Sequence, residues 1–390
     1  GTALPYRLCS SKPQPLLMPE ILLLCEYATL SGGERSMLAT LGEVRRVGFS
    51  VAVIAPAEGP LAEELTRRDV ELIPFSLTDA AGKRHPQGPL REALARLLRQ
   101  RRPALLHANS LSMGRLSGPV ADELHLPSIS HLRDIIRLSP QATADVDRHT
   151  RLLAVSQATR AYHLAAGLTD AKLHVLHNGV DLQQFRPRPP TGYLHRELGL
   201  APGAQLVGTI GQIGLRKGLD VLATAAISLG QRLPAVHYLI IGERWSEKQE
   251  SREFEASLHA VAKRMDGRMH FLGVRRDVER ILNELSLLVH PARQEPLGRV
   301  LLEAAASGTP VLATDVGGTP EIFPAELNAA RLIPANDPES LARSIAELLA
   351  DDAQRGHLAA SARRRAEAAF SIERAAAGLV KHYQELLDDS

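Results

Sequence analysis

The sequence predicts an α/β protein made of two doubly wound domains, each with a parallel sheet. Short apolar runs alternate with longer segments of helical periodicity along nearly the whole chain. These runs are nearly continuous in apolar residues, as expected for strands that helices cover on both faces. A proline-rich break near the middle of the 390 residues divides the pattern into two parts. One ordinary core does not accommodate a chain of this length, so two domains are expected.

The predicted strands are short, and the segments between them have the period of helices. Before the break the strands are expected over residues 21–27, 51–56, 70–75, 104–109, 128–131, 152–156 and 174–177. After the break they are expected over residues 206–211, 238–242, 270–273, 287–291, 311–314 and 332–334. The clearest helical patterns cover residues 34–47, 89–101, 219–229 and 299–306.

The domain boundary is predicted at residues 185–190, where Pro187, Pro189 and Pro190 remove backbone donors that a helix or sheet needs. Residues 1–19 have no continuous apolar stretch and are interpreted as a tail instead of a signal peptide. The expected parts are this tail (1–19), an N-terminal domain (20–184), a C-terminal domain (185–370) and a C-terminal helix that packs back toward the N-terminal domain (371–390).

The bulk composition argues against several classes of protein. Lys and Arg number 46 against 44 Asp and Glu, whereas a nucleic-acid partner requires a markedly basic domain. The longest apolar run, residues 21–25, is far shorter than the roughly 20 residues of a membrane span. Two cysteines, Cys9 and Cys25, are too few for a disulfide framework. A reducing cytoplasm is therefore the expected compartment.

The segment 295–310 carries the most chemical information. It follows the predicted strand 287–291 and begins a helix near Gly298, and Gly308 and Pro310 then end that helix. A glycine at a helix start lets a phosphate approach backbone N–H groups that have no partner within the helix. The helix dipole favours the same anion. The segment therefore predicts a phosphate-binding loop.

Two glutamates flank this helix start. Glu295 lies in the loop before it, where its carboxylate can meet a sugar beyond the phosphates. Glu303 lies about a turn and a half inside the helix, where it can accept hydrogen bonds from ribose hydroxyls. Leu297 and Arg299 are assigned to the same donor site. The alternative is an ordinary amphipathic helix with one exposed and one capping glutamate, which Gly298 makes less favourable.

The segment resembles the signature of the retaining glycosyltransferases of family 4, a glutamate pair with seven residues between its members. Glu295 and Glu303 have this spacing, Gly298 matches the internal glycine, and the resemblance extends over residues 32–387. It implies the GT-B fold, in which two Rossmann-like domains face each other across a cleft. The N-terminal domain is then on the acceptor side and the C-terminal domain binds a nucleotide sugar. By resemblance, Glu295 holds hydroxyls of the donor sugar and Glu303 holds the ribose.

The segment 208–218 supplies cations. Its glycines lack the spacing of a dinucleotide site. Because a fixed cation in a dry cleft stabilises a departing diphosphate, Lys217 is assigned a catalytic role. Family members commonly have an arginine where this chain has Gln212. Arg216 is the candidate that replaces this arginine in donor binding. The alternative is that Arg216 is only a solvated surface charge. The sequence has no Asp-x-Asp motif in a strand-end loop, and none of its His and Asp residues cluster with the spacing of metal ligands. Neither a metal nor a cofactor is therefore predicted.

The first half contributes a glycine pair and a histidine. In residues 31–35 the paired glycines can bring backbone amides close to a phosphate or an acceptor oxygen. The family has a similar loop facing the cleft, so Gly33 is assigned to the donor site. His131 ends a strand and resembles the family's histidine near the transferred sugar, which implies a catalytic role; a structural histidine is the alternative. His107 ends another strand and is expected to be structural.

Two further segments have alternative interpretations. Residues 178–181, Asn-Gly-Val-Asp, form a turn that resembles the family's interdomain crossing, and we expect a structural role at the hinge. Residues 89–102 form a basic amphipathic helix with five arginines. Its default interpretation is a solvated helix face. The alternative hypothesis is that the helix binds peripherally to the inner face of an anionic membrane.

The sequence thus predicts a metal-independent glycosyltransferase that retains anomeric configuration and moves a sugar from a nucleotide-diphosphate donor to a hydroxyl acceptor. The acceptor is expected to be a carbohydrate or lipid-linked, in polysaccharide, lipopolysaccharide or glycolipid synthesis. Two alternatives remain, a sugar-nucleotide epimerase of the same fold and a catalytically silent sugar-nucleotide-binding protein, which Gln212 favours. A nicotinamide-dependent dehydrogenase is least favoured, because the glycine fingerprint is missing.

Overall fold

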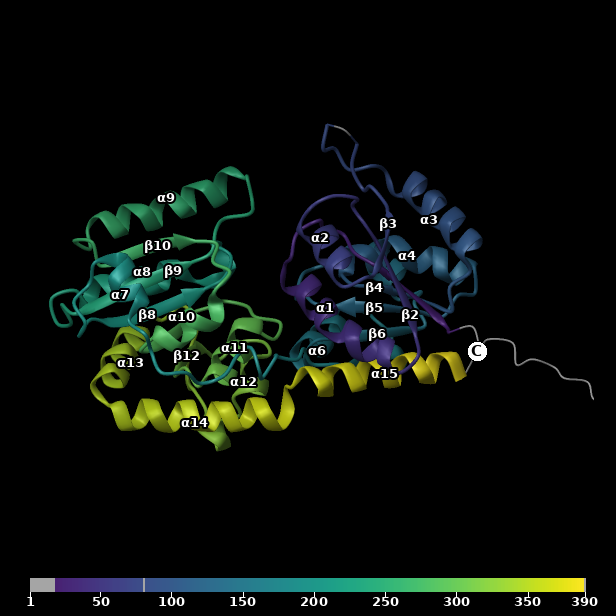
Figure 1. The fold of residues 1–390 in the computed structure, drawn as a ribbon. Coiled ribbons are helices and arrows are strands. Elements are labelled where there is room, and N and C mark those ends of the chain that lie inside the picture. The colour runs from purple at the N-terminus through teal and green to yellow at the C-terminus, as the bar shows by residue number, and fades with distance from the viewer. Residues whose placement is uncertain (1–17, 80, 389–390) are drawn as a thin grey trace, which may run out of the picture.

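The computed structural model describes residues 18–79 and 81–388, which form two lobes (Figure 1). The sheet of the N-terminal lobe has seven strands and that of the C-terminal lobe has six. The predicted fold class of two doubly wound parallel domains is confirmed, and a strand is present at each of the thirteen predicted positions. The predicted tail lies outside the described residues except for Met18 and Pro19.

The N-terminal sheet has the strand order β3-β2-β1-β4-β5-β6-β7, and its neighbouring strands are parallel. The order reverses between β1 and β4, the place where open α/β sheets bind ligands. The strands are β1 (Glu20–Leu24), β2 (Ser50–Ala55), β3 (Glu71–Pro74), β4 (Leu105–Ala108), β5 (Ser128–Leu132), β6 (Arg151–Ala154) and β7 (Leu173–Val175).

Helices cover both faces of this sheet because successive residues of each strand point to opposite sides. In β1, Ile21 and Leu23 pack with α1, α2 and α15, whereas Leu22 and Leu24 pack with α3 and α4. The helices of this lobe are α1 (Gly32–Arg46), α2 (Pro60–Arg67), α3 (Gln87–Arg101), α4 (Leu111–Glu123), α5 (Pro140–Val146), α6 (Gln157–Ala165) and, from the end of the chain, α15 (Ile372–Asp388).

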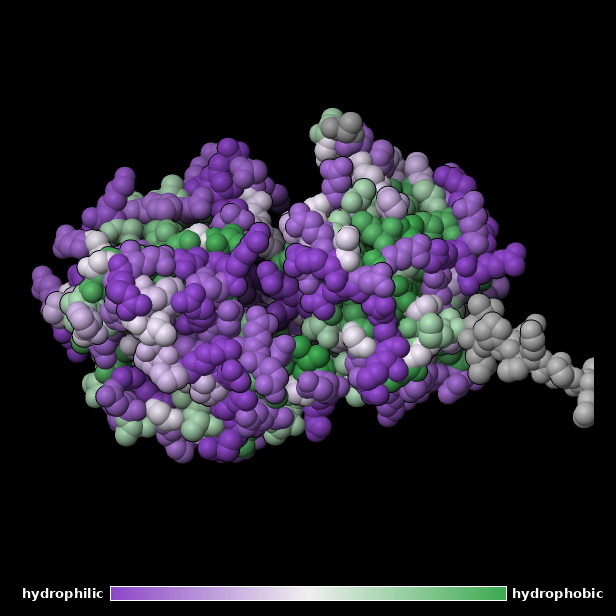
Figure 2. All heavy atoms as spheres, viewed as in Figure 1, coloured by the Kyte–Doolittle hydropathy of each residue, from purple (hydrophilic) through white to green (hydrophobic). Residues whose placement is uncertain are grey.

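The C-terminal sheet repeats this plan with the order β10-β9-β8-β11-β12-β13, which reverses between β8 and β11. Its strands are β8 (Gln205–Ile210), β9 (Val236–Ile241), β10 (Met269–Gly273), β11 (Leu287–His290), β12 (Val311–Thr314) and β13 (Arg331–Ile333). Its helices are α7 (Tyr193–Leu198), α8 (Leu219–Leu229), α9 (Gln249–Lys263), α10 (Val278–Glu284), α11 (Arg299–Ser307), α12 (Thr319–Ile322), α13 (Pro338–Ala350) and α14 (Asp352–Ala369). Figure 2 shows a notch between the two lobes, bordered mostly by hydrophilic residues.

Two segments cross between the lobes side by side. The backbone N–H of Val180 donates to the Phe370 carbonyl oxygen over 2.8 Å, and the Ile372 N–H donates to the Val180 carbonyl oxygen over 3.2 Å. Beyond the second crossing, α15 runs along the N-terminal lobe (Figure 1) and buries Leu379 and Tyr383 in its core. The first described strand, β1, and the last described helix, α15, therefore belong to the same lobe.

The basic helix α3 is largely neutralised by its own lobe. Arg91 pairs with Asp145, Arg99 pairs with Glu123, and Arg101 pairs with two glutamates. Since three of the five arginines in residues 89–102 have carboxylate partners, the structure favours the solvated-face interpretation over a membrane-binding face. No helix in the described ranges is both long and apolar enough to cross a bilayer.

The crossing leaves no room for a side chain at position 179. A Cβ there would lie 2.7 Å from the Ile372 Cα. We expect Gly179→Ala to lower the free energy of unfolding by about 1–3 kcal/mol, as overpacking does. Gly356→Ala is the control, because position 356 is exposed within α14 with open space around it, and this change should be neutral or stabilising by up to about 1 kcal/mol. Urea unfolding of both variants tests the assignment, which is wrong if the two respond alike.

Candidate active site

Two loops meet where the C-terminal sheet reverses. The loop after β8 contains a short 3₁₀ helix (Leu215–Lys217), and the loop after β11 contains Glu295. Lys217 Nζ lies 2.5 Å from Glu295 Oε2, so the predicted catalytic pair is in direct contact. The two loops fit tightly because Gly218, with a φ of +65°, leaves no space for a Cβ against the Pro291 carbonyl.

A third residue, His290, completes this cluster. Its Nε2 lies 2.8 Å from Glu295 Oε2, the oxygen that also binds Lys217. His290 ends β11 and its side chain is buried, as is that of Glu295. Both hydrogen bonds fall on Oε2, which leaves Oε1 available to accept from a ligand hydroxyl.

The electrostatics of the cluster fix its protonation. Burial alone would raise the pKa of Glu295, but the charge of Lys217 and the hydrogen bond with His290 outweigh burial and hold this pKa well below its usual range. Burial lowers the pKa of His290, and the charge of Lys217 lowers it further. At neutral pH, Glu295 is therefore a carboxylate and His290 is a neutral imidazole that donates its Nε2–H.

The predicted helix start lies beside this cluster. Helix α11 begins at Arg299, as predicted, and Gly298 precedes it with a φ of +89°, without a side-chain cap. The first N–H groups of α11 are therefore open to an anion. Behind the loop, the Gly318 N–H donates to the Glu295 carbonyl oxygen over 2.9 Å. Gly317 has no space for a Cβ against the same carbonyl.

The other predicted donor residues lie in different surroundings. Arg299 and Glu303 form an ion pair along α11, with Arg299 NH2 2.8 Å from Glu303 Oε1. A Cβ on Gly32, at the start of α1, would lie 3.6 Å from Arg299 Cδ, so this pair faces the N-terminal lobe. Leu297, in contrast, is 1% exposed within the hydrophobic core. Only its main chain remains for contact with a ligand.

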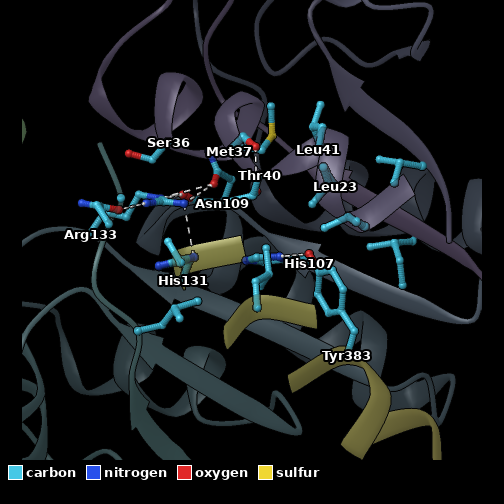
Figure 3. A pocket seen from close by; sticks show the side chains of 18 of the residues that line it. Leu23, Ser36, Met37, Thr40, Leu41, His107, Asn109, His131, Arg133 and Tyr383 are labelled. Atoms are coloured by element: carbon cyan, nitrogen blue, oxygen red, sulfur yellow. Dashed lines mark hydrogen bonds between the residues drawn. The ribbon is translucent and has the colours of Figure 1, made fainter. Parts of the chain in front are cut away.

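In the N-terminal lobe, His131 belongs to a buried polar network at the ends of β4 and β5 (Figure 3). Arg133 lies at its centre, with NH2 3.2 Å from His131 Nδ1, 2.8 Å from Asn109 Oδ1, and NH1 3.0 Å from Asn178 Oδ1. Burial lowers the pKa of Arg133 to about 10, so its charge persists at neutral pH. Burial, and then the charge of Arg133, lower the pKa of His131 well below its usual value. His131 is therefore neutral.

A small cavity of about 30 Å³ adjoins this network. Its lining includes three buried nitrogen atoms without a hydrogen-bond partner in the described part of the chain: His107 Nε2, Asn109 Nδ2 and His131 Nε2. This volume holds about two water molecules. His107 stacks on His131 with ring centroids 5.5 Å apart, and its Nδ1 lies 2.7 Å from the Tyr383 hydroxyl of α15. Figure 3 shows these three side chains in a row.

Gly33 lies beneath the same network. A Cβ on Gly33 would lie 3.1 Å from Arg133 Cδ and 3.6 Å from Asn109 Nδ2. The missing side chain at position 33 therefore allows Arg133 to pass close to the start of α1. A role of Gly33 toward a phosphate remains a prediction.

The predicted residues fall into two groups on opposite lobes. In the described residues no contact joins His131 to Lys217 or Glu295. The lobes approach each other at Arg216, whose NH1 lies 4.0 Å from Asp134 Oδ1. Arg216 therefore faces the N-terminal lobe at Asp134, three residues after His131 in the sequence, and is itself next to Lys217 in the sequence.

His290 and Arg133 were not predicted from the sequence. His290 is a histidine at a strand end, the same signal that selected His131, and it could have been found in this way. Arg133 carried no such signal, because its partners Asn109 and Asn178 come from distant parts of the chain.

The two facing Rossmann-like lobes define a protein of GT-B type, and comparison with known families agrees. The family described as Glycosyltransferase Family 4 matches residues 30–184. The family described as Glycosyl transferases group 1 matches residues 193–365. The chain belongs to these group 1/family 4 glycosyltransferases, and the predicted resemblance is confirmed.

Curated relatives share the family. The chain is 32% identical over 219 residues to a D-inositol 3-phosphate glycosyltransferase of Xylanimonas cellulosilytica, covering 55% of this chain and 51% of that protein. It is 32% identical over 216 residues to the lipopolysaccharide core biosynthesis mannosyltransferase LpcC of Rhizobium leguminosarum, covering 55% and 60%. The chain thus spans about half the length of the curated relatives it matches.

The fold is similar to that of Anabaena HepE in complex with UDP-glucose. The TM-score is 0.81 at 23% identity, and the match covers 95% of this chain and 100% of HepE. At this identity the likeness supports the GT-B fold alone.

The buried His107 generates a testable pH dependence. Burial lowers its pKa to about 3, whereas an unfolded histidine titrates near 6.5. Because only the unfolded chain takes up this proton, stability is lost as the pH falls below the unfolded value. Between pH 7 and pH 5 we expect the wild type to lose about 2 kcal/mol more stability than His107→Gln. Urea unfolding at both pH values measures this difference, and equal losses would contradict it.

Proposed function

We propose that this protein is a retaining, metal-independent glycosyltransferase of the hexosyltransferase type, which moves a sugar from a nucleotide-diphosphate donor to an acceptor hydroxyl. The Lys217–Glu295–His290 cluster beside the open N-terminus of α11 carries this proposal. It combines a cation, a fixed carboxylate and free backbone N–H groups at one sheet edge. These are the groups that a diphosphate and an adjoining sugar require.

The donor is proposed to lie in the C-terminal lobe. Its diphosphate contacts Lys217 and the N–H groups of α11, and Arg216 adds charge from the edge of the cleft. Glu303 accepts from the ribose hydroxyls. Glu295 receives the sugar hydroxyls on Oε1, since its Oε2 is occupied by Lys217 and His290.

In the transfer step, the bond between the anomeric carbon and the diphosphate oxygen breaks, and the acceptor oxygen bonds to the anomeric carbon. The acceptor's proton passes to the departing diphosphate, because both groups lie on one face of the sugar. No carboxylate serves as a covalent nucleophile. Lys217 and the helix start stabilise the negative charge on the leaving group. His131 is proposed to contact the sugar from the N-terminal lobe through its unpaired Nε2.

The acceptor is proposed to bind the N-terminal lobe and to be a carbohydrate or a lipid-linked saccharide. The relatives named above, a D-inositol 3-phosphate glycosyltransferase and a lipopolysaccharide core biosynthesis mannosyltransferase, support this class. A UDP- or GDP-sugar is the proposed donor, in agreement with the UDP-glucose complex of HepE. The proposed location is the cytoplasm, including its membrane surface.

A second candidate is a catalytically silent protein that only binds a sugar nucleotide. Gln212 favours it, because Gln212 lines a recess with Lys217 and His290 where family members commonly have an arginine. Hydrolysis or transfer of a donor by the purified protein would exclude this candidate. Formation of an epimerised sugar without an acceptor would instead indicate a sugar-nucleotide epimerase of the same fold.

Kinetics of two variants test the proposed roles. Glu295→Gln removes the charge that Lys217 and His290 share, and Lys217→Ala removes the cation at the diphosphate. Each should lower kcat/KM by well over tenfold, on the order of 10²–10³. Lys248→Ala is the control, since Lys248 is exposed in the same lobe. Near-normal turnover of either site variant would count against the mechanism.

A chelator tests the metal-independent step. We expect turnover to be unchanged by excess EDTA, because Lys217 and the start of α11 supply the positive charge. Donor-sugar release is measured by chromatography before and after EDTA, and again after addition of Mg²⁺ or Mn²⁺. Loss of turnover with EDTA and its return with either ion would overturn this part of the proposal.

A further inference from the structure

Glu321, at the end of the short helix α12, links the two lobes through its side chain. Glu321 Oε2 accepts from the Gln157 N–H over 2.8 Å, and Oε1 accepts from the Ala158 N–H over 2.9 Å. Both N–H groups belong to the first turn of α6 in the N-terminal lobe, whereas Glu321 belongs to the C-terminal lobe. A carboxylate of one lobe therefore caps a helix of the other.

This cap completes the N-terminus of α6. The Ser156 hydroxyl accepts from the Thr159 N–H over 3.0 Å, so α6 satisfies only the third of its first three N–H groups with its own side chain. Ser156 and Thr159 are fully buried, whereas Gln157 is exposed and Ala158 is half-buried, so the end of α6 that Glu321 caps lies at the surface between the lobes. Without Glu321, these two N–H groups would lose their protein acceptor, and the positive end of the helix dipole would lose its counter-charge.

Glu321 also contacts the segments that cross between the lobes. Its Oε2 lies 3.0 Å from His177 Nε2 on the first crossing. The His177 ring packs on Phe370 of the second crossing, with centroids 5.5 Å apart. Arg365 of α14 donates to the Glu321 carbonyl oxygen over 3.0 Å and lies over the same Phe370 ring. One residue is therefore tied to α6 and to both crossings.

The residues that lead into Glu321 pack on the loop of the candidate donor site. The Gly318 N–H donates to the Glu295 carbonyl oxygen, and neither Gly317 nor Gly318 has room for a Cβ against this loop. From the other side, the Thr159 hydroxyl of α6 lies 3.5 Å from the Pro296 carbonyl oxygen. A shift of α6 against the C-terminal lobe is thus transmitted over three residues to the backbone of Glu295.

We propose that Glu321 is a positioning residue, which fixes the pivot between the lobes and thereby holds the Glu295 loop in register with the N-terminal lobe. It touches neither donor nor acceptor, and it acts through α6 and Gly317–Gly318. Its effect on the lobes stands on these contacts alone. Its effect on turnover rests on the proposed function.

The first test measures the distance between the lobes. Spin labels on cysteines at the exposed positions Glu63 of α2 and Glu250 of α9 report it, in a Cys9→Ser background. Glu321→Gln keeps the size of the side chain but removes its charge and turns an NH2 group toward one of the α6 N–H groups. We expect a distance distribution at least twice as broad as that of the wild type. Glu326→Gln, an exposed glutamate five residues away, should leave the distribution unchanged.

The second test separates positioning from general destabilisation. Glu321→Gln should lower kcat by roughly 10-fold to 100-fold, as a displacement of about 1 Å does. Its Kd for UDP or GDP should remain within about threefold of the wild type, because Lys217 and the start of α11 are untouched. Glu321→Asp, which keeps the charge, should recover part of kcat. If the substitution only reduced the fraction of folded protein, the apparent kcat and the number of nucleotide-binding sites would fall by the same fraction.

Both measurements on Glu321→Gln can contradict the proposed role of Glu321. A wild-type distance distribution or a wild-type kcat in Glu321→Gln overturns the inference. If Glu321→Gln does not fold, His177→Phe replaces it: this change removes the 3.0 Å contact but keeps a ring against Phe370, and an unchanged distribution there also overturns the inference. If the wild type transfers no sugar, the proposed function fails, while the distance measurement still decides the role of Glu321.

Discussion

A buried carboxylate must be paired, and this constraint organises the C-terminal lobe. Glu295 is 5% exposed and remains ionised only because Lys217 and His290 contact it from two other segments. The three residues bring the ends of β8 and β11 together at the place where the sheet order reverses. The same contacts place a cation beside the open N-terminus of α11. The atoms that satisfy the buried charge are thus the same atoms that are proposed to bind an anion.

The N-terminal lobe satisfies a comparable constraint with neutral partners. Arg133 is held by Asn109, Asn178 and His131, and the described residues provide no carboxylate within ion-pair distance of it. This network joins the ends of β4 and β5 to the first crossing between the lobes. The nitrogen atoms without partners, on His107, Asn109 and His131, all border one cavity. Polar groups are therefore concentrated at the sheet edges that face the cleft.

The sequence was sufficient for the fold because its signals are local. The apolar run of β1 and the glycine at each end of α11 are signals that depend on neighbouring residues alone. The contact between Lys217 and Glu295 was implied only by the family pattern, since 78 residues separate them. Arg133 and Glu321 were not found, because their partners lie on other strands or on the other lobe. Side-chain direction was equally hidden, as the core position of Leu297 shows.

Helix α15 gives the polypeptide an unusual order of assembly. Leu379, Tyr383 and Leu386 contribute to the core of the lobe that the first half of the sequence builds. During synthesis, that lobe must wait with an exposed apolar groove over α1 until α15 leaves the ribosome, although domains generally mature from the N-terminus onward. The C-terminal lobe, whose strands and helices are all made earlier than α15, can finish first. The order in which the two lobes mature would then be the reverse of the order in which they are translated.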